Sequence, residues 1–100
     1  MKLHQKGFLL VELSKVDSSW DYELVSKALA EYKLTGRYWV NTLRVALEEL
    51  AAAGLVTRIG EQLDDGSHAG PGKVLFNYQL SEFGRSRMRD TGLLEKGVDK

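Results

Sequence analysis

The sequence predicts an α+β fold that is mainly α-helical: a three-helix bundle followed by a β-hairpin and a short C-terminal helix. Two observations carry this prediction. Before Gly54, apolar residues recur at helical spacing in three successive segments. After Gly54 they form strand-like runs rich in β-branched and aromatic side chains, separated by a stretch that holds several glycines and the only proline.

The first two helices are predicted from short apolar patterns. Residues 7–15 carry apolar side chains one helical turn apart, which indicates a mostly buried helix. A second helix is expected over about 20–31, with Ser18 and Ser19 as N-caps. Gly36 breaks the pattern that follows.

The third helix, residues 37–53, has the clearest pattern in the chain. Its apolar positions form one stripe at 100° per residue: Val40, Leu43, Leu47 and Leu50. The opposite face carries Arg37, Tyr38, Asn41, Val45 and Glu48, with Thr42 and Arg44 on its flanks. Gly54 is a natural terminator just beyond the helix.

The second half of the chain predicts a hairpin and a last helix. Strand-like runs cover residues 55–59 and 74–80, and the residues 64–72 between them contain enough breakers for a flexible tip. Ser81 is expected to cap the last helix. The apolar residues of that helix are Phe83, Met88, Leu93 and Leu94.

Length and composition limit the class of protein. We expect one domain over residues 1–100, with its core over about 7–95 and a frayed tail over 96–100. Fourteen basic and fourteen acidic side chains balance, which argues against a general polyanion binder but leaves local patches open. No cysteine is present, so disulfides and thiol chemistry are excluded.

No cofactor, metal site or enzyme signature is predicted. A P-loop ending at Lys73 would need glycine in place of Ser67 and Ser or Thr in place of Val74, and a nucleophile elbow and an HExxH motif are both absent. The apolar run at 8–11 is too short for a signal peptide or a membrane span, so we expect a cytoplasmic protein without membrane contact.

The predicted element order and two motifs resemble a known family. The stretch NTLRVALEELAAAGLVTR, residues 41–58, is similar to the recognition helix and first wing strand of MarR-like and PadR-like bacterial regulators, which are winged helix-turn-helix proteins. Residues 78–85 resemble that family's strand exit, and the resemblance covers roughly residues 8–94. One departure is the connection over 31–37, which is longer than the tight turn usual in the family. The matching positions are Leu43, Leu47, Leu50, Gly54, Leu55, Val56 and Arg58.

The resemblance implies a sequence-specific transcriptional regulator that binds double-stranded DNA. Helix 37–53 would enter the major groove, with the wing over 60–74 alongside. Asparagine bonds adenine and arginine bonds guanine bidentately, and each good pair discriminates by ~1–3 kcal/mol. The expected DNA-binding residues are Arg37, Tyr38, Asn41, Thr42, Arg44, Val45, His68 and Lys73.

The resemblance also implies a homodimer. The candidate interface comes from the first and last helices: Phe8, Leu9, Met88, Leu93 and Leu94. Nothing indicates a small-molecule effector, and in a chain of this length one would bind between subunits.

A second interpretation stays open, in which the same fold is a protein-protein interaction module without DNA binding. The neutral net charge and the acidic wing favour it, and Glu48 and Glu49 on the third helix would repel phosphates that approached their end of it. The hairpin is acidic, and its His68 is expected to be a mobile loop residue. The arginines of the last helix are expected to form a solvated or intersubunit face rather than a phosphate clamp: Arg85, Arg87 and Arg89.

Overall fold

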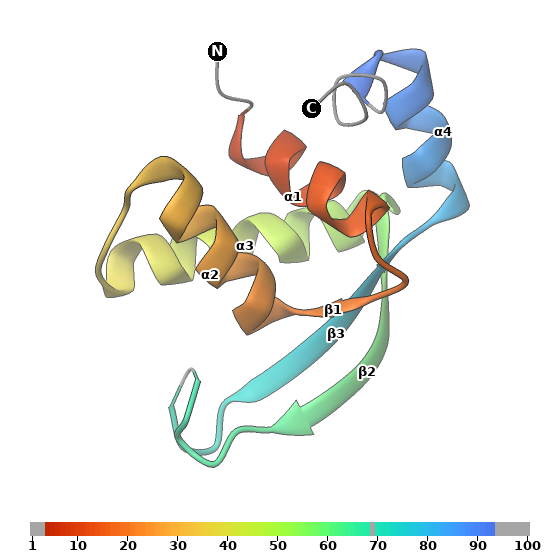
Figure 1. Ribbon diagram of the computed structural model, residues 1–100. Coiled ribbons are helices and arrows are strands. Elements are labelled where there is room, and N and C mark those ends of the chain that lie inside the picture. Colours follow the sequence, from red (N-terminus) through yellow and green to blue (C-terminus); the bar gives the residue numbers. More distant parts are fainter. Residues whose placement is uncertain (1–3, 69, 94–100) are drawn as a thin grey trace.

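A computed structural model describes residues 4–68 and 70–93, which form four helices and a three-stranded antiparallel sheet (Figure 1). The predicted mainly helical α+β class is confirmed. Leu94 and the expected tail over 96–100 lie outside the described residues. The elements in chain order are α1 (Gln5–Ser14), β1 (Ser19–Trp20), α2 (Asp21–Tyr32), α3 (Arg37–Ala52), β2 (Val56–Leu63), β3 (Val74–Leu80) and α4 (Glu82–Asp90).

The core lies between the first three helices and the sheet. The apolar stripe of α3 is buried as predicted at Leu43, Leu47 and Leu50, and Val40 is half-buried. Gly54 follows the helix with a φ of +81°, a conformation that glycine adopts without steric cost. Fully buried side chains from the other elements close the core: Leu9, Leu13, Leu24, Leu75, Tyr78 and Met88.

The start of α2 differs from the prediction. Trp20 directly precedes the helix, and Glu23 Oε1 accepts a hydrogen bond from the Trp20 backbone N–H at 2.9 Å. Ser19 is buried and pairs with Tyr78 in the sheet. The expected caps at Ser18 and Ser19 were therefore wrong, because the chain here forms a strand that is too short to show an alternating pattern.

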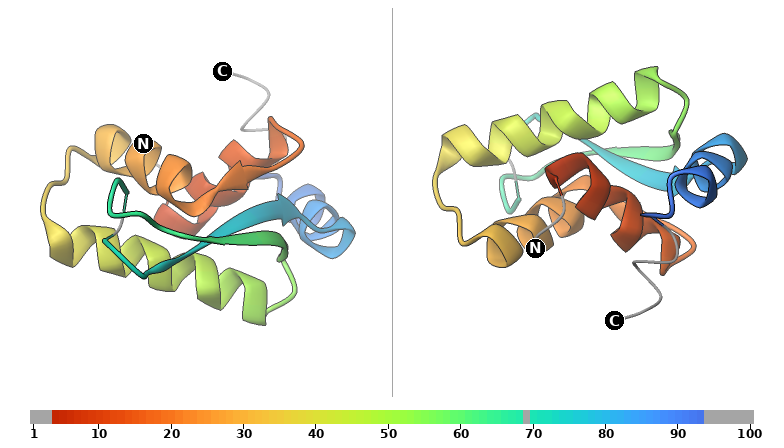
Figure 2. Two further views of the ribbon diagram at one scale, coloured as in Figure 1. Left: turned by 90° about the horizontal axis from the view of Figure 1, so that it is seen from below. Right: turned by 90° about the horizontal axis from the view of Figure 1, so that it is seen from above.

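The sheet has the order β1-β3-β2, so β3 is its central strand. β2 is longer than the predicted 55–59, and its register with β3 shifts between Arg58 and Gly60. The connection between α2 and α3 is shorter than expected: it covers residues 33–36 and begins with Lys33 in the left-handed conformation. The hairpin tip lies below α2 and α3 in Figure 1, and the view from below in Figure 2 shows it across the space between these two helices.

The last helix is capped as predicted, since Ser81 Oγ accepts a hydrogen bond from the Gly84 N–H at 2.9 Å. It ends at Asp90, before Leu93. Met88 from this helix is 1% exposed and lies in the core.

The expected dimer interface needs correction at two positions. Leu9 and Met88 are both buried in the core of their own chain, so they are not available to a second copy. Phe8 is half-buried and packs edge-on against Tyr32, with ring centroids 5.6 Å apart. Leu93 is also half-buried.

Candidate functional site

The outer face of α3 is open to solvent. Its side chains are exposed where the sequence pattern predicted, with Tyr38 70% and Val45 49% accessible. Arg37, Asn41 and Glu48 complete this exposed face. Two hollows flank it, one toward the hairpin tip and one toward the start of α1.

The hollow toward the hairpin has a volume of about 250 Å³. It brings together predicted residues that lie far apart in the sequence. From α3 come Arg37, Asn41 and Arg44, and from the hairpin tip come His68 and Lys73. Val40 completes the wall, and neither Asp nor Glu is among these lining residues.

The hollow toward α1 is larger, about 480 Å³, and more apolar. Tyr38, Thr42 and Val45 line it, together with Asn41, which borders both hollows. The Thr42 hydroxyl donates a hydrogen bond to the Tyr38 carbonyl at 2.8 Å. The predicted DNA-binding residues are thus divided between two sides of α3. The start of α1 and the rest of α3 contribute His4, Gln5, Lys6, Ala46 and Glu49.

Arg44 is held by the fold. One guanidinium nitrogen lies 3.0 Å from Asp21 Oδ2, and another donates to the Val74 carbonyl at 3.0 Å. The same Asp21 oxygen accepts the Phe76 backbone N–H at 3.2 Å. This pair joins α2, α3 and β3, so the Arg44 guanidinium positions the hairpin within the fold. That Arg44 also contacts DNA stays a prediction.

His68 is placed by a contact that the sequence did not predict. Its ring stacks on Tyr22 of α2, with centroids 3.7 Å apart and planes 12° from parallel. This stack ties the His68 ring to α2, a contact that the expectation of a loop residue did not include. No pattern joins Tyr22 to a residue so distant in the chain, so only the tertiary structure reveals this pair.

A buried carboxylate organises the hairpin tip. Asp64 is only 5% exposed, and its oxygens accept backbone N–H groups of Gly66 at 3.1 Å, His68 at 3.2 Å and Gly70 at 2.7 Å. Asp65 is exposed, and hydrogen bonds from Ser67 lower the pKa of its carboxyl group. The glycine-rich tip, predicted to be flexible, thus has a defined hydrogen-bond network among its described residues.

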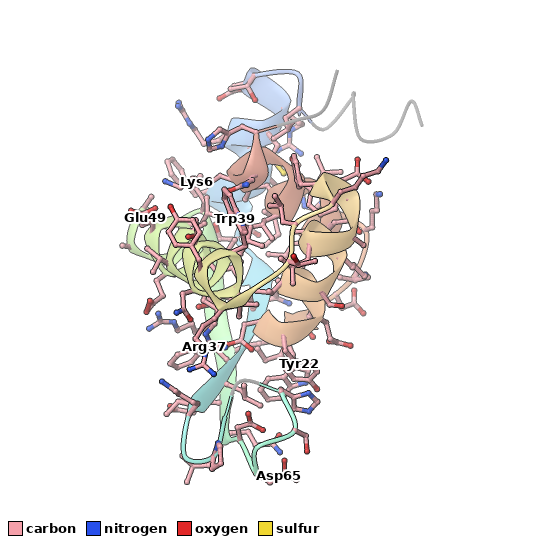
Figure 3. All side chains as sticks on the ribbon, turned by 90° about the vertical axis from the view of Figure 1, so that its left-hand side faces the viewer. Lys6, Tyr22, Arg37, Trp39, Glu49 and Asp65 are labelled. Atoms are coloured by element: carbon pink, nitrogen blue, oxygen red, sulfur yellow. The ribbon has the colours of Figure 1, made fainter. Side chains whose placement is uncertain are left out.

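The acidic residues of α3 lie beside cations. Glu49 pairs with Lys6 at 3.0 Å, and Glu48 lies 3.9 Å from Arg58. These partners reduce the negative potential that the two glutamates create along the exposed face. Figure 3 shows Lys6 and Glu49 together on the side of α3 away from the hairpin, whereas Arg37 and Tyr22 lie toward the hairpin tip.

The α4 arginines lie elsewhere. Figure 1 shows α4 and the hairpin tip at opposite ends of the molecule. Arg87 and Arg89 are exposed and Arg85 is half-buried. This basic group is therefore separate from both hollows.

No family model, curated protein or solved structure matches this chain. Across residues 4–68 and 70–93, no group of three or more His, Cys, Asp or Glu side chains is placed to bind a metal ion. Within the same ranges, every helix is too short or too polar to cross a bilayer.

Proposed function

We propose that this chain is a winged helix-turn-helix domain that binds double-stranded DNA, with α3 as its recognition helix and residues 60–74 as its wing. The order of helix, short strand, two helices and hairpin supports the assignment. So does the position of the hairpin tip, which shares a hollow with the first turns of α3.

The observation that carries this proposal is the uncovered outer face of α3. Tyr38 is 70% exposed although the Trp39 ring lies edge-on to it, and Val45 is 49% exposed. The B-DNA major groove admits one α-helix, provided that its groove-facing side is free. Asn41 offers an amide for adenine, and Val45 offers an apolar contact for the thymine methyl group.

The proposed role is that of a sequence-specific transcriptional regulator acting as a homodimer. A single module of this size covers little DNA surface, so a second copy on a neighbouring half-site would raise both affinity and specificity. The exposed face of α3 would then occur twice, related by the dimer axis.

The test is a titration against a pool of genomic duplexes at two salt concentrations. We expect affinity to fall steeply as salt rises, because phosphate contacts release counterions. Asn41→Ala is expected to weaken sequence preference by ~1–3 kcal/mol at one position. Arg87→Ala, which removes an exposed arginine at the far end of the molecule, is the control and should leave the preference unchanged.

Failure to retain any duplex at low salt would contradict DNA binding. That result would favour the protein-interaction module, which the neutral net charge also allows.

A further inference from the structure

We propose that the hollow between the start of α3 and the hairpin tip holds one phosphate group of the DNA backbone. Arg37 and Lys73 would then position the duplex, whereas the sequence alone favoured a base contact for Arg37. This inference rests on the proposed function. It divides the proposed DNA interface into a part that contacts the phosphate backbone and a part that contacts base edges.

The lining chemistry fits a phosphate group. Arg37, Lys73 and Asn41 supply hydrogen-bond donors, and the His68 imidazole adds a further ring nitrogen. A carboxylate that would repel an anion is absent from the lining. The volume of about 250 Å³ is several times the ~30 Å³ that a water molecule occupies in the liquid.

The positively charged side chains that line the hollow differ in whether they already have an acidic partner. Arg44 is neutralised by Asp21 at 3.0 Å, behind the lining. Arg37 and Lys73 have no ion pair within the described part of the chain. Two like charges that border one hollow repel each other, and an anion between them relieves that repulsion.

The hairpin wall of the hollow is built before any ligand binds. The Lys73 carbonyl accepts the Asp64 backbone N–H at 2.8 Å, and the Lys73 N–H donates to the Gly70 carbonyl at 3.1 Å. His68 is held by its stack on Tyr22. A site whose walls are already placed loses less conformational entropy when it binds.

The neighbouring hollow has a different character. Tyr38, Thr42 and Val45 of α3 offer it apolar surface and hydroxyl groups. The lysine that lines it, Lys6, is already paired with Glu49 at 3.0 Å. Such groups suit base edges and thymine methyls more than phosphates. In the proposed complex the DNA phosphate therefore lies on the hairpin side of α3 and the base edges lie on its α1 side. Asn41, which lines both hollows, lies between them.

The experiment compares Arg37→Gln and Lys73→Gln with Asn41→Ala across a pool of duplexes. Both glutamine variants replace exposed side chains, so the fold should be retained. We expect each variant to weaken all duplexes to the same extent and to reduce the salt slope, and the double variant to reduce the slope by about 0.9, the share of one phosphate. The ranking of sequences should change only with Asn41→Ala, and Arg87→Gln is the control for loss of a distant charge.

A second measurement uses inorganic phosphate as the probe. Phosphate should shift the NMR signals of the His68 ring and the Lys73 amide in the unmodified chain. The double variant Arg37→Gln/Lys73→Gln should lose that response.

The outcomes separate this inference from the proposed function. Duplex binding with an altered sequence ranking in Arg37→Gln and an unchanged salt slope would overturn the phosphate assignment and leave DNA binding intact. Phosphate shifts without duplex binding at low salt would support the anion site and reject DNA as its source.

Discussion

At Gly84 the absence of a side chain lets α4 lie against the turn after α3. A Cβ atom there would overlap the Leu55 carbonyl oxygen and approach the carbonyl carbon to 2.9 Å. It would also meet Leu80 Cδ1 at 3.0 Å. Because the nearest atoms belong to backbone, they cannot rotate away as the end of a side chain does.

Gly84→Ala is therefore expected to destabilise the protein by about 1–3 kcal/mol, although alanine is the better helix former. Urea unfolding measures the difference. Ser86→Ala in the same helix serves as the control for helix propensity. Equal or greater stability of the Gly84→Ala variant would show that α4 does not pack closely on Leu55.

A second prediction at this scale concerns Tyr78, which is 1% exposed. Burial raises the pKa of its phenol, against the opposing effect of the hydrogen bond from Arg58. The unfolded chain has the lower pKa, so the neutral phenol stabilises the fold fully below pH ~10. That contribution is lost as pH rises through the native pKa.

Phenolate absorbance during an alkaline titration tests whether the pKa of the Tyr78 phenol is raised. The part of the native titration that occurs at the highest pH, here the late component, should shrink in Tyr78→Phe. Tyr32 also contributes to it, because burial raises the pKa of the Tyr32 phenol. An unchanged late component in Tyr78→Phe would contradict the prediction.

Between elements, the pair of Asp21 and Arg44 determines how the hairpin meets the helices. Their side chains are 3% and 22% exposed, and both also bond backbone atoms of β3. Removing one partner of such a pair leaves a buried charge without compensation.

Arg44→Ala should accordingly lower the free energy of unfolding by an amount near the low end of ~3–5 kcal/mol, because the guanidinium is partly exposed. Lys27→Ala provides the contrast: it breaks a 3.9 Å pair with Glu12 whose lysine is 50% exposed, and should cost at most about 1 kcal/mol. Denaturant unfolding of both variants measures the two losses in the free energy of unfolding. Similar losses would mean that the Asp21–Arg44 pair contributes no more than a surface ion pair.

The elements also differ in how well the sequence predicted them. The third helix was predicted almost to the residue, because Leu43, Leu47 and Leu50 repeat on one side. β1 was missed, since its two residues, Ser19 and Trp20, join the sheet only through pairing with β3. Local periodicity predicts elements that bury one face, whereas a two-residue strand is defined entirely by its distant partner.

For the whole molecule, the proposed homodimer is the main prediction. A solution mass twice that of the 11.2 kDa chain is expected if two copies bind neighbouring half-sites. Leu9 and Met88 are excluded from the interface by their burial, so Phe8→Ser is the informative variant and should reduce the mass toward that of the monomer. A monomeric mass for the unmodified chain at high concentration would contradict the homodimer.

At this scale the candidate site was predicted in part. The exposed residues of α3, such as Tyr38 and Val45, follow from its amphipathic pattern. The roles of Arg44 and His68 do not, because each depends on a side chain from α2.

The sequence by itself determined the helices, the hairpin and the outward face of α3, because hydrophobic periodicity and glycine positions act within a few residues. Only the tertiary structure decided which polar side chains bond to other parts of the chain and which remain available to a partner. Arg44 forms an ion pair with the buried Asp21. His68 stacks on Tyr22, beside the hollow that Arg37 and Lys73 border. Such pairings depend on distances across the folded chain, and no local pattern encodes them.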